Sequence, residues 1–245
     1  MRDMVDEKLT TDQTNALAVM RSGKNVFLTG GAGVGKSYVI GRFCYEQAAK
    51  GKKVLVTTST HIWKPKQDYC ADLAAAQSLW HAGRYAVVGL EEAGTGKLVG
   101  LPQEKLQQYV ASADIVLVEA DGAKGKPCKA PREGEPVILP ECDTVIGVVG
   151  MDALGCSIES ACFRVDEVCA LLGVSAEHVL DEVDLAKILL SELGTRKSVG
   201  SRKYYVVLNK CDSNALLELA ESIRDRLIIQ GVPNKQILIR GSAIQ

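Results

Sequence analysis

Short apolar runs alternate with amphipathic stretches along almost the whole chain. Continuous apolar runs are typical of strands buried on both faces, and apolar residues three and four positions apart are typical of helices that cover such strands. The apolar runs predict strands at residues 25–29, 53–57, 114–119, 144–149, 203–208 and 236–239. The amphipathic stretches predict helices at residues 8–22, 36–49, 66–83, 102–111, 164–173, 183–193 and 214–230, and residues 85–100 predict a hairpin. This alternation favours an α/β fold with a mostly parallel sheet.

Residues 30–37 carry the clearest chemical pattern, because GGAGVGKS matches the G-x-x-x-x-G-K-[ST] sequence of a phosphate-binding loop. The segment follows a predicted strand and opens a predicted helix, which is the context that this motif requires. We expect Lys36 to contact the β- and γ-phosphates of a nucleoside triphosphate, and Ser37 to bind Mg²⁺. The expected nucleotide contacts in this segment are Gly30, Gly31, Ala32, Gly33, Val34, Gly35, Lys36, Ser37 and Tyr38.

The motif narrows the predicted fold to a three-layer sandwich similar to that of P-loop NTPases. The chain has 245 residues, of which 47% are hydrophobic and 24% charged, so it has the size and balance of a globular protein with a sizeable core. The sequence contains no repeat and no low-complexity linker. We therefore expect one P-loop nucleotide-binding domain at residues 25–245, preceded by a helical extension at residues 1–24.

Two acidic residues end the apolar run at residues 115–118, in the sequence EADG. A P-loop protein needs a carboxylate at this place to hold Mg²⁺, directly or through water. We expect Glu119 to be the acid on the metal side and Asp121 to orient or deprotonate the attacking group, although the two roles are exchangeable at this stage. Both are candidate metal ligands, together with Ser37, and both are candidate catalytic residues, together with Lys36.

The last third of the chain carries a pattern for base recognition. Asn209, Lys210 and Asp212 form an N-K-x-D sequence after a predicted strand, and Ser242 and Ala243 follow the final one. These sequences resemble two boxes of G proteins, in which the aspartate accepts two N–H bonds from guanine. Adenine cannot donate that pair of bonds, so the pattern predicts a preference for GTP.

A second pattern favours ATP. Residues 9–13 and 22–30 resemble the entry of superfamily-one DNA helicases, in which a glutamine recognises adenine; Gln13 stands at that place. The chain is too short for two helicase motor domains. We therefore interpret this segment as a helical lid or extension, and ATP stays open as the alternative nucleotide.

Charge and composition exclude several other classes. The 29 Lys and Arg residues nearly balance the 30 Asp and Glu residues, and aromatic residues are only 5%. This is unlike a nucleic-acid coat or a polybasic membrane surface. No apolar stretch reaches the length of a membrane helix, and the N-terminus lacks the apolar core of a signal peptide. We expect a cytoplasmic protein with neither membrane nor nucleic acid as partner. The eight cysteines form no CxxC pair, so we expect free and mostly buried thiols.

From residue 25 onward the chain resembles the YqeC family, accessory proteins of selenium-dependent molybdenum hydroxylases. The stretches that carry the resemblance are residues 54–61, 116–122, 129–131, 135–138 and 147–155. The first 35 residues depart from it, because the family's loop is usually a shorter G-A-G-G-K-T sequence. The resemblance implies a P-loop fold and a role in maturing a metal or selenium enzyme, with that enzyme as a client protein.

Two segments beside the expected site are candidates for contacts with a second substrate. Thr58, Thr60 and His61 follow the second strand, where hydroxyl groups face the ligand crevice of a parallel sheet. Lys124 and Lys126 belong to a basic segment within the predicted loop 121–141, and such a segment is able to hold an anion. Three functions follow as hypotheses: a Mg²⁺-dependent NTPase that prefers GTP, a kinase acting on a small anionic acceptor, and a nucleotide-dependent switch with negligible turnover.

Overall fold

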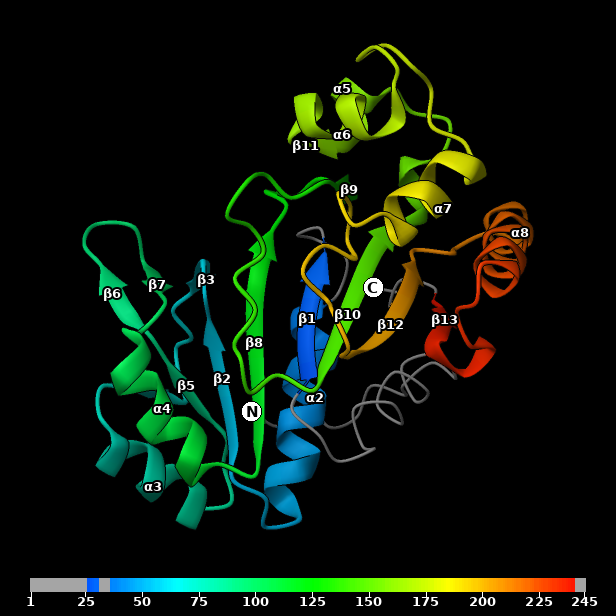
Figure 1. Ribbon diagram of the computed structural model, residues 1–245. Coiled ribbons are helices and arrows are strands. Elements are labelled where there is room, and N and C mark those ends of the chain that lie inside the picture. Colours follow the sequence, from blue (N-terminus) through cyan, green and yellow to red (C-terminus); the bar gives the residue numbers. More distant parts are fainter. Residues whose placement is uncertain (1–25, 31–35, 241–245) are drawn as a thin grey trace.

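The computed structural model of the chain describes residues 26–30 and 36–240. Its main sheet has the strand order β13-β12-β10-β1-β8-β2-β5-β4, and all neighbouring strands run parallel. The carboxyl ends of the central strands therefore meet at one edge, at the top of Figure 1. The strands are β1 (Val26–Gly30), β2 (Val54–Thr58), β4 (Tyr69–Cys70), β5 (Ala86–Val88), β8 (Ile115–Gly122), β10 (Thr144–Gly150), β12 (Lys203–Asn209) and β13 (Ile237–Ile239).

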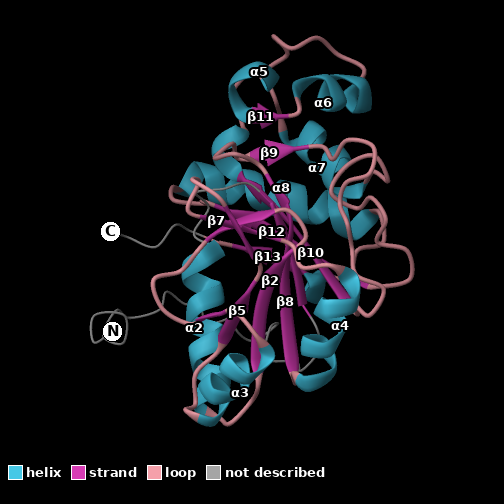
Figure 2. Cartoon of the chain, turned by 90° about the vertical axis from the view of Figure 1, so that its left-hand side faces the viewer, coloured by secondary structure: helices cyan, strands magenta, loops and turns pink. Residues whose placement is uncertain are grey.

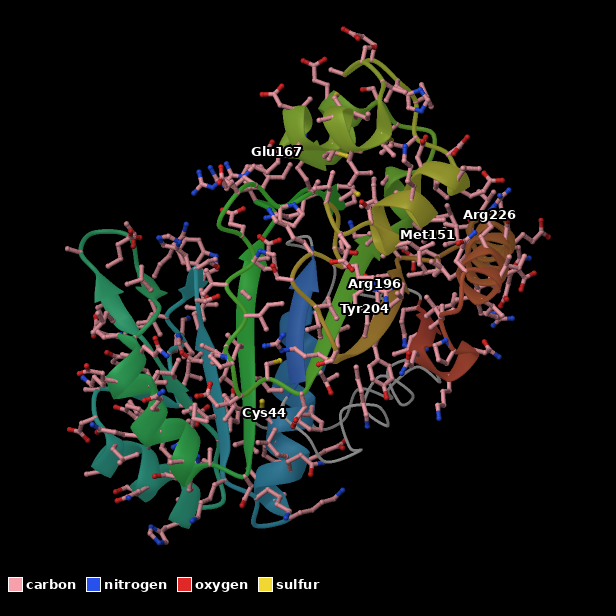
Figure 3. All side chains as sticks on the ribbon, in the orientation of Figure 1. Cys44, Met151, Glu167, Arg196, Tyr204 and Arg226 are labelled. Atoms are coloured by element: carbon pink, nitrogen blue, oxygen red, sulfur yellow. The ribbon has the colours of Figure 1, made fainter. Side chains whose placement is uncertain are left out.

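Helices cover both faces of this sheet, as two views at right angles show (Figures 1 and 2). Ile115 and Leu117 of β8 pack in one core with Cys44, which Figure 3 labels. The alternate residues Val116 and Val118 belong to a second and larger core on the other face. The main helices are α2 (Lys36–Ala49), α3 (Leu73–His81), α4 (Gln103–Ser112), α7 (Glu182–Leu190) and α8 (Asn214–Ile229). The predicted α/β fold with a mostly parallel sheet is thus confirmed.

Smaller elements surround the carboxyl edge. Figure 1 shows α5, α6 and β11 above the ends of the central strands, and a small antiparallel sheet β3-β7-β6 at the side of β2. The two short strands β9 and β11 pair in parallel and join the loop after β8 to the α5–α6 segment. These elements are β3 (His61–Trp63), β6 (Leu90–Glu92), β7 (Lys97–Val99), β9 (Cys128–Lys129), α5 (Ile158–Ala161), β11 (Cys162–Phe163) and α6 (Val165–Leu172), with a 3-10 turn at Met151–Ala153 after β10. A second 3-10 turn, Asn234–Gln236, leads into the amino end of β13.

Three predicted elements differ from the structure. The helix expected at residues 66–83 begins only at Leu73, because Tyr69 and Cys70 pair with β5 and the Asp72 side chain caps the helix by accepting a bond from the Ala75 N–H at 2.8 Å. The hairpin expected at 85–100 is confined to β6 and β7, because β5 joins the main sheet. The loop expected from residue 121 starts two residues later and contains β9. In each case pairing with a strand distant in sequence overrides the local pattern.

The structure also bears on what the sequence predicts for membrane helices and for the cysteines. Across the described ranges, no helix is both long and apolar enough to cross a lipid bilayer. All eight cysteines are free thiols and five of them are buried, as predicted. The expected helix at 8–22 and the extension 1–24 lie outside the described residues.

Candidate functional site

The strand pairing brings the sequence motifs to one edge of the sheet. Gly30 at the end of β1 is the register partner of Gly122 in β8, after an irregularity in the pairing. On the other side of β8, Glu119 is the register partner of Thr58, at the end of β2. The phosphate-loop sequence therefore begins beside the strand that carries both candidate acids.

The residues expected to bind phosphate are described only in part. Gly30 ends β1, and Lys36, Ser37 and Tyr38 form the first turn of α2. Gly31, Ala32, Gly33, Val34 and Gly35 lie outside the described residues, as do the side chains of the first turn of α2. The predicted strand–loop–helix context is present, and the roles of these residues remain predictions.

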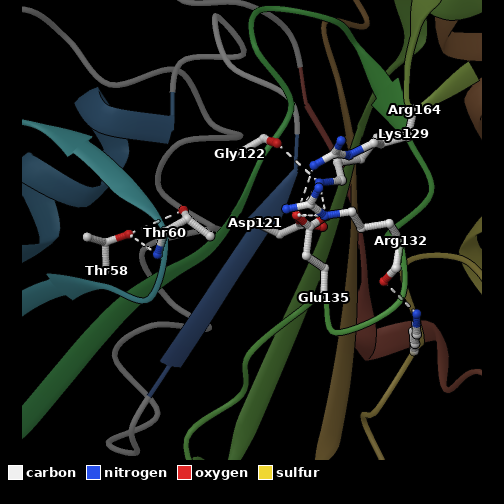
Figure 4. Close-up of polar contacts among 9 residues, drawn as sticks. Thr58, Thr60, Asp121, Gly122, Lys129, Arg132, Glu135 and Arg164 are labelled. Carbon is white, nitrogen blue, oxygen red and sulfur yellow. Dashed lines mark hydrogen bonds and ion pairs between the residues drawn. The ribbon is translucent and has the colours of Figure 1, made fainter. Parts of the chain in front are cut away.

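Thr58 fixes the end of β2 against β8 through its hydroxyl group. The hydroxyl donates a hydrogen bond to the Glu119 carbonyl oxygen at 2.7 Å, and the Ser59 N–H donates to the same oxygen at 2.9 Å. Thr58 Oγ1 in turn accepts the Thr60 N–H at 2.9 Å (Figure 4). The Thr58 hydroxyl therefore holds the backbone that positions the half-buried Glu119. The candidate His61 is exposed in β3, with Nε2 3.4 Å from a carboxylate oxygen of Glu92.

Asp121 is buried and forms an ion pair with Lys129, which is 3% exposed. The Lys129 ammonium also donates to the Gly122 carbonyl oxygen at 3.1 Å and lies 3.6 Å from Glu135 Oε2. Burial raises the pKa of Asp121, and the charge of Lys129 opposes this rise only in part. The charged state of Asp121 therefore depends on Lys129, because a buried carboxylate without a cation would take up a proton.

Glu135 joins three cations at the same place (Figure 4). Its Oε1 atom lies 3.0 Å from Arg132 Nε and 3.0 Å from Arg164 Nη2, and its Oε2 atom faces Lys129. Burial alone would raise the pKa of Glu135, but the charges of Lys129, Arg164 and Arg132 together lower it. Glu135 thus links the loop after β8 to the beginning of α6.

We expect Glu135→Gln to lower the free energy of unfolding by about 1–2 kcal/mol at pH 7, because it removes a carboxylate that lies within 3.6 Å of three cationic groups. Since the pKa of Glu135 is lowered on folding, its contribution is present above the ordinary pKa of glutamate and is lost as the pH falls through the lowered value. The difference between the two proteins should therefore shrink between about pH 5 and pH 3. Urea unfolding at several pH values measures it, and a difference independent of pH would contradict this interpretation.

The two candidate lysines of the loop after β8 have different surroundings. Lys124 is exposed, and its Nζ atom lies 5.2 Å from the centroid of the Phe163 ring. Lys126 donates a hydrogen bond to the Ser160 carbonyl oxygen at 2.6 Å, just before β11. Lys126 therefore connects the loop to the α5–α6 segment, whereas the Lys124 ammonium faces solvent and an aromatic ring.

The residues expected to recognise the base follow β12. Asn209 is buried at the end of this strand, and Asp212 is exposed. The Lys210 ammonium lies 2.5 Å from Asp152 Oδ2. The Cys211 N–H donates to the Arg240 carbonyl oxygen at 2.6 Å, so the chain after β13 runs beside the N-K-x-D sequence. Ser242 and Ala243 lie outside the described residues.

Sequence reasoning missed Glu135 and Arg164 as parts of this edge, and it did not predict that Lys129 is buried. The local sequence did contain a signal for Lys129, because this lysine stands between Cys128 and the apolar pair Ala130-Pro131. A lysine among apolar residues is more often buried than one in a charged run. No comparable signal marks Arg164, which is 29 residues from its partner and meets it only in the folded chain.

Within the described ranges, no group of three or more His, Cys, Asp or Glu side chains is arranged to hold a metal ion. Mg²⁺ bound with a nucleotide needs only one or two carboxylates, since phosphates and water complete its shell. The half-buried carboxylate of Glu119, next to β1, suits such an ion.

The fold is that of an α/β protein in which the described parts of the candidate motifs follow the ends of parallel strands. Residues 28–166, more than half of the chain, match the family described as YqeC protein. The chain therefore belongs to the YqeC family. It is 29% identical over 180 residues to a protein of Escherichia coli (strain K12) named "Uncharacterized protein YqeC", over 67% of this chain and 69% of that protein.

Two further similarities concern a short part of the chain. A stretch of 51 residues is 49% identical to a protein of Bdellovibrio bacteriovorus named "ATP-dependent DNA helicase Pif1". A stretch of 50 residues is 44% identical to a Psychrobacter protein of the same name. These matches cover 21% and 20% of this chain but only 12% and 8% of the helicases. They give limited support to nucleotide binding.

Proposed function

We propose that the chain binds a nucleoside triphosphate with Mg²⁺ at the carboxyl edge of the sheet and hydrolyses it. The observation that carries this proposal is the sequence GGAGVGKS between β1 and α2, next to the strand end that bears Glu119 and Asp121. Backbone N–H groups of such a loop and the positive end of the following helix bind phosphate oxygens. We accordingly propose a P-loop NTPase-like sandwich at residues 25–245, with residues 1–24 as its helical extension.

The proposal assigns one role to each charged side chain. Lys36 would bind the β- and γ-phosphates, and Ser37 and Glu119 would hold Mg²⁺, which would offset the negative charge of the phosphates. Asp121 orients the attacking group. The ion pair of Asp121 with Lys129 supports this division, because the buried ammonium group already offsets the charge that a metal ion would offset at Asp121. Asp121 is the second candidate metal ligand, because Lys129 contacts its Oδ1 atom and a carboxylate has two oxygen atoms.

The cellular role that we propose is that of an accessory or maturation factor for a selenium-dependent molybdenum hydroxylase. Membership of the YqeC family supports it, and the client hydroxylase is the expected protein partner. Hydroxylase isolated from cells that lack this chain should have reduced activity and an incomplete metal or selenium centre. A hydroxylase with full activity and a complete centre would exclude the role.

The preferred nucleotide is proposed to be GTP. The N-K-x-D sequence follows β12, two strands from β1, so a nucleotide held by the phosphate loop would extend its base toward Asp212. ATP is the second candidate, because the similar helicases are named ATP-dependent and Gln13 stands in a helicase-like sequence.

We expect calorimetric titration to show at least about a hundredfold tighter binding of GTP than of ATP. The reason is that guanine offers the aspartate two N–H donors and adenine does not. Asp212→Asn should shift the preference toward xanthine nucleotides, which offer the complementary edge. The ATP alternative predicts instead a preference for ATP that Gln13→Ala removes and Asp212→Asn leaves intact. Equal binding of both nucleotides, unchanged in Asp212→Asn, would leave only a general triphosphate site.

The acceptor of the phosphoryl group is settled by product analysis. Hydrolysis releases free phosphate in the absence of any other substrate. The cations near Phe163 favour the kinase reaction as a second candidate, because they lie beside the strand end and are suited to an anionic acceptor. Such a reaction would yield a phosphorylated small molecule. Tight nucleotide binding with neither product would indicate a nucleotide-dependent switch.

A further inference from the structure

Three cations gather around the aromatic ring of Phe163, the second residue of β11. Arg164 Cζ lies 4.6 Å from the ring centroid, Lys124 Nζ lies 5.2 Å from it and Lys129 Nζ lies 5.4 Å from it. The cations come from two segments that are distant in sequence and are joined by the pairing of β9 with β11. An aromatic face attracts each cation, but it carries no charge that would offset their mutual repulsion.

The positive charge of this group exceeds its negative charge. Arg132 adds a fourth cation through Glu135, and the carboxylates in these contacts are those of Glu135 and Asp121. Lys129 is engaged by Asp121, the Gly122 carbonyl oxygen and Glu135 together. The surplus therefore rests on the outer cations. Arg132 and Arg164 contact Glu135, and Lys124 and Arg164 lie over the Phe163 ring.

Two of the outer cations occupy unusual backbone conformations. Lys124 has a φ of 47° and Arg164 a φ of 64°, both in the left-handed region. For a residue that is not glycine, this costs on the order of 1 kcal/mol and persists only where the surroundings hold it. The Arg164 Nε atom is also buried and makes no hydrogen bond within the described part of the chain. A buried N–H donor without a partner is uncommon in folded proteins and calls for an explanation.

The place of the group connects it with the nucleotide site. Lys129 bonds to the carbonyl oxygen of Gly122, which is the register partner of Gly30, where the phosphate-loop sequence begins. Figure 4 shows Asp121, Lys129, Glu135 and Arg164 close together at this strand end. An anion bound by the outer cations would therefore lie near the triphosphate end of a nucleotide.

We propose that Lys124, Arg132 and Arg164 form a binding site for the oxyanion group, carboxylate or phosphate, of a second substrate. Its role as a substrate site rests on the proposed nucleotide function, whereas anion binding itself does not. Arg164 supplies positive charge and the N–H groups of its guanidinium that do not contact Glu135, and the exposed Lys124 and Arg132 supply charge from the solvent side. Lys129 and Glu135 are positioning residues, because they hold Arg164 and the loop after β8 in place.

The test is calorimetric titration of the full chain with inorganic phosphate and, separately, with succinate, at constant ionic strength. The Lys36→Ala protein is used for both titrations, so that the phosphate loop does not contribute. We expect one of the two probes to bind, which also identifies the oxyanion. Arg164→Gln and Lys124→Glu, each added to Lys36→Ala, should weaken this binding at least tenfold.

The matched control is Lys50→Glu, which reverses a charge at an exposed residue just after α2, at the opposite edge of the sheet. It should change the affinity for the probe less than twofold. Since Arg164→Gln removes a partner of Glu135 and is able to disturb the fold, exposed Lys124 provides the independent variant. Succinate titration of the unsubstituted chain repeats the measurement without Lys36→Ala.

Absence of binding by both probes would overturn the proposal, as would equal weakening by Lys50→Glu and Lys124→Glu. Titration of the unsubstituted chain with GTP and ATP is a separate measurement. If nucleotide binding fails while succinate or phosphate still binds through Lys124 and Arg164, the proposed function is wrong and the anion site stands. If the nucleotide binds and neither probe does, the proposed anion site is wrong and the proposed nucleotide site stands.

Discussion

Lys36→Ala is expected to weaken binding of the nucleoside triphosphate by at least about a hundredfold and to abolish its turnover. Lys36 is the only charged side chain of the GGAGVGKS sequence, in which the other expected phosphate contacts come from backbone N–H groups and a hydroxyl group. A hundredfold loss corresponds to about 2.7 kcal/mol of binding free energy. Calorimetry with GTP and ATP measures the affinity, and phosphate release measures turnover.

The control is Lys50→Ala, because Lys50 is an exposed lysine beyond the other end of the same helix. This variant should bind and turn over nucleotide as the unsubstituted chain does. The melting temperature of both variants should stay close to that of the unsubstituted chain. Normal turnover by Lys36→Ala would exclude the phosphate loop as the nucleotide site, whatever the base preference.

Lys129→Met is expected to lower the free energy of unfolding by about 3–5 kcal/mol at pH 7, which is the usual cost of leaving a buried charge without its partner. Asp121 would stay buried with its pKa raised further, so the variant loses stability as the pH rises through that pKa. The deficit should therefore be smaller at pH 4 than at pH 7. Urea unfolding at both pH values measures it.

Two comparisons separate this effect from an ordinary lysine substitution. Asp121→Asn combined with Lys129→Met removes both charges and should recover part of the lost stability. Lys210→Met breaks an ion pair with Asp152 whose side chains are 21% and 42% exposed, so it should cost no more than about 1 kcal/mol. If Lys129→Met and Lys210→Met lower the free energy of unfolding equally, the buried ion pair contributes no more to stability than the exposed one.

The main elements of the fold were predictable because their patterns are local. The apolar runs that became β1, β2, β8, β10 and β12 are contiguous, and α2 has the expected bounds, Lys36–Ala49. Consecutive strands joined by helices favour a parallel sheet, in which strand ends meet at one edge. The sequence alone thus placed Glu119 and Asp121 beside the phosphate-loop motif, and the pairing of Gly30 with Gly122 agrees with this placement.

What the sequence could not show are the properties that arise when distant segments meet. Tyr69 and Cys70 became a strand only because β5 offers them a partner. Glu119 and Asp121 stand two residues apart in one strand and were equivalent by pattern, yet only the folded chain gives Asp121 a buried lysine.

The charged group around Glu135 and Phe163 also forms only when segments that are distant in sequence meet. Glu135 and Arg164 meet across 29 residues, and the pairing of β9 with β11 brings Lys124 and Phe163 together. Periodicity and motifs determined the layers, the strand ends and the candidate chemistry, because each depends on neighbours in the chain. Burial and charge pairing were decided by the tertiary structure, because the energy of a charge depends on which atoms exclude water from it and which opposite charge lies near.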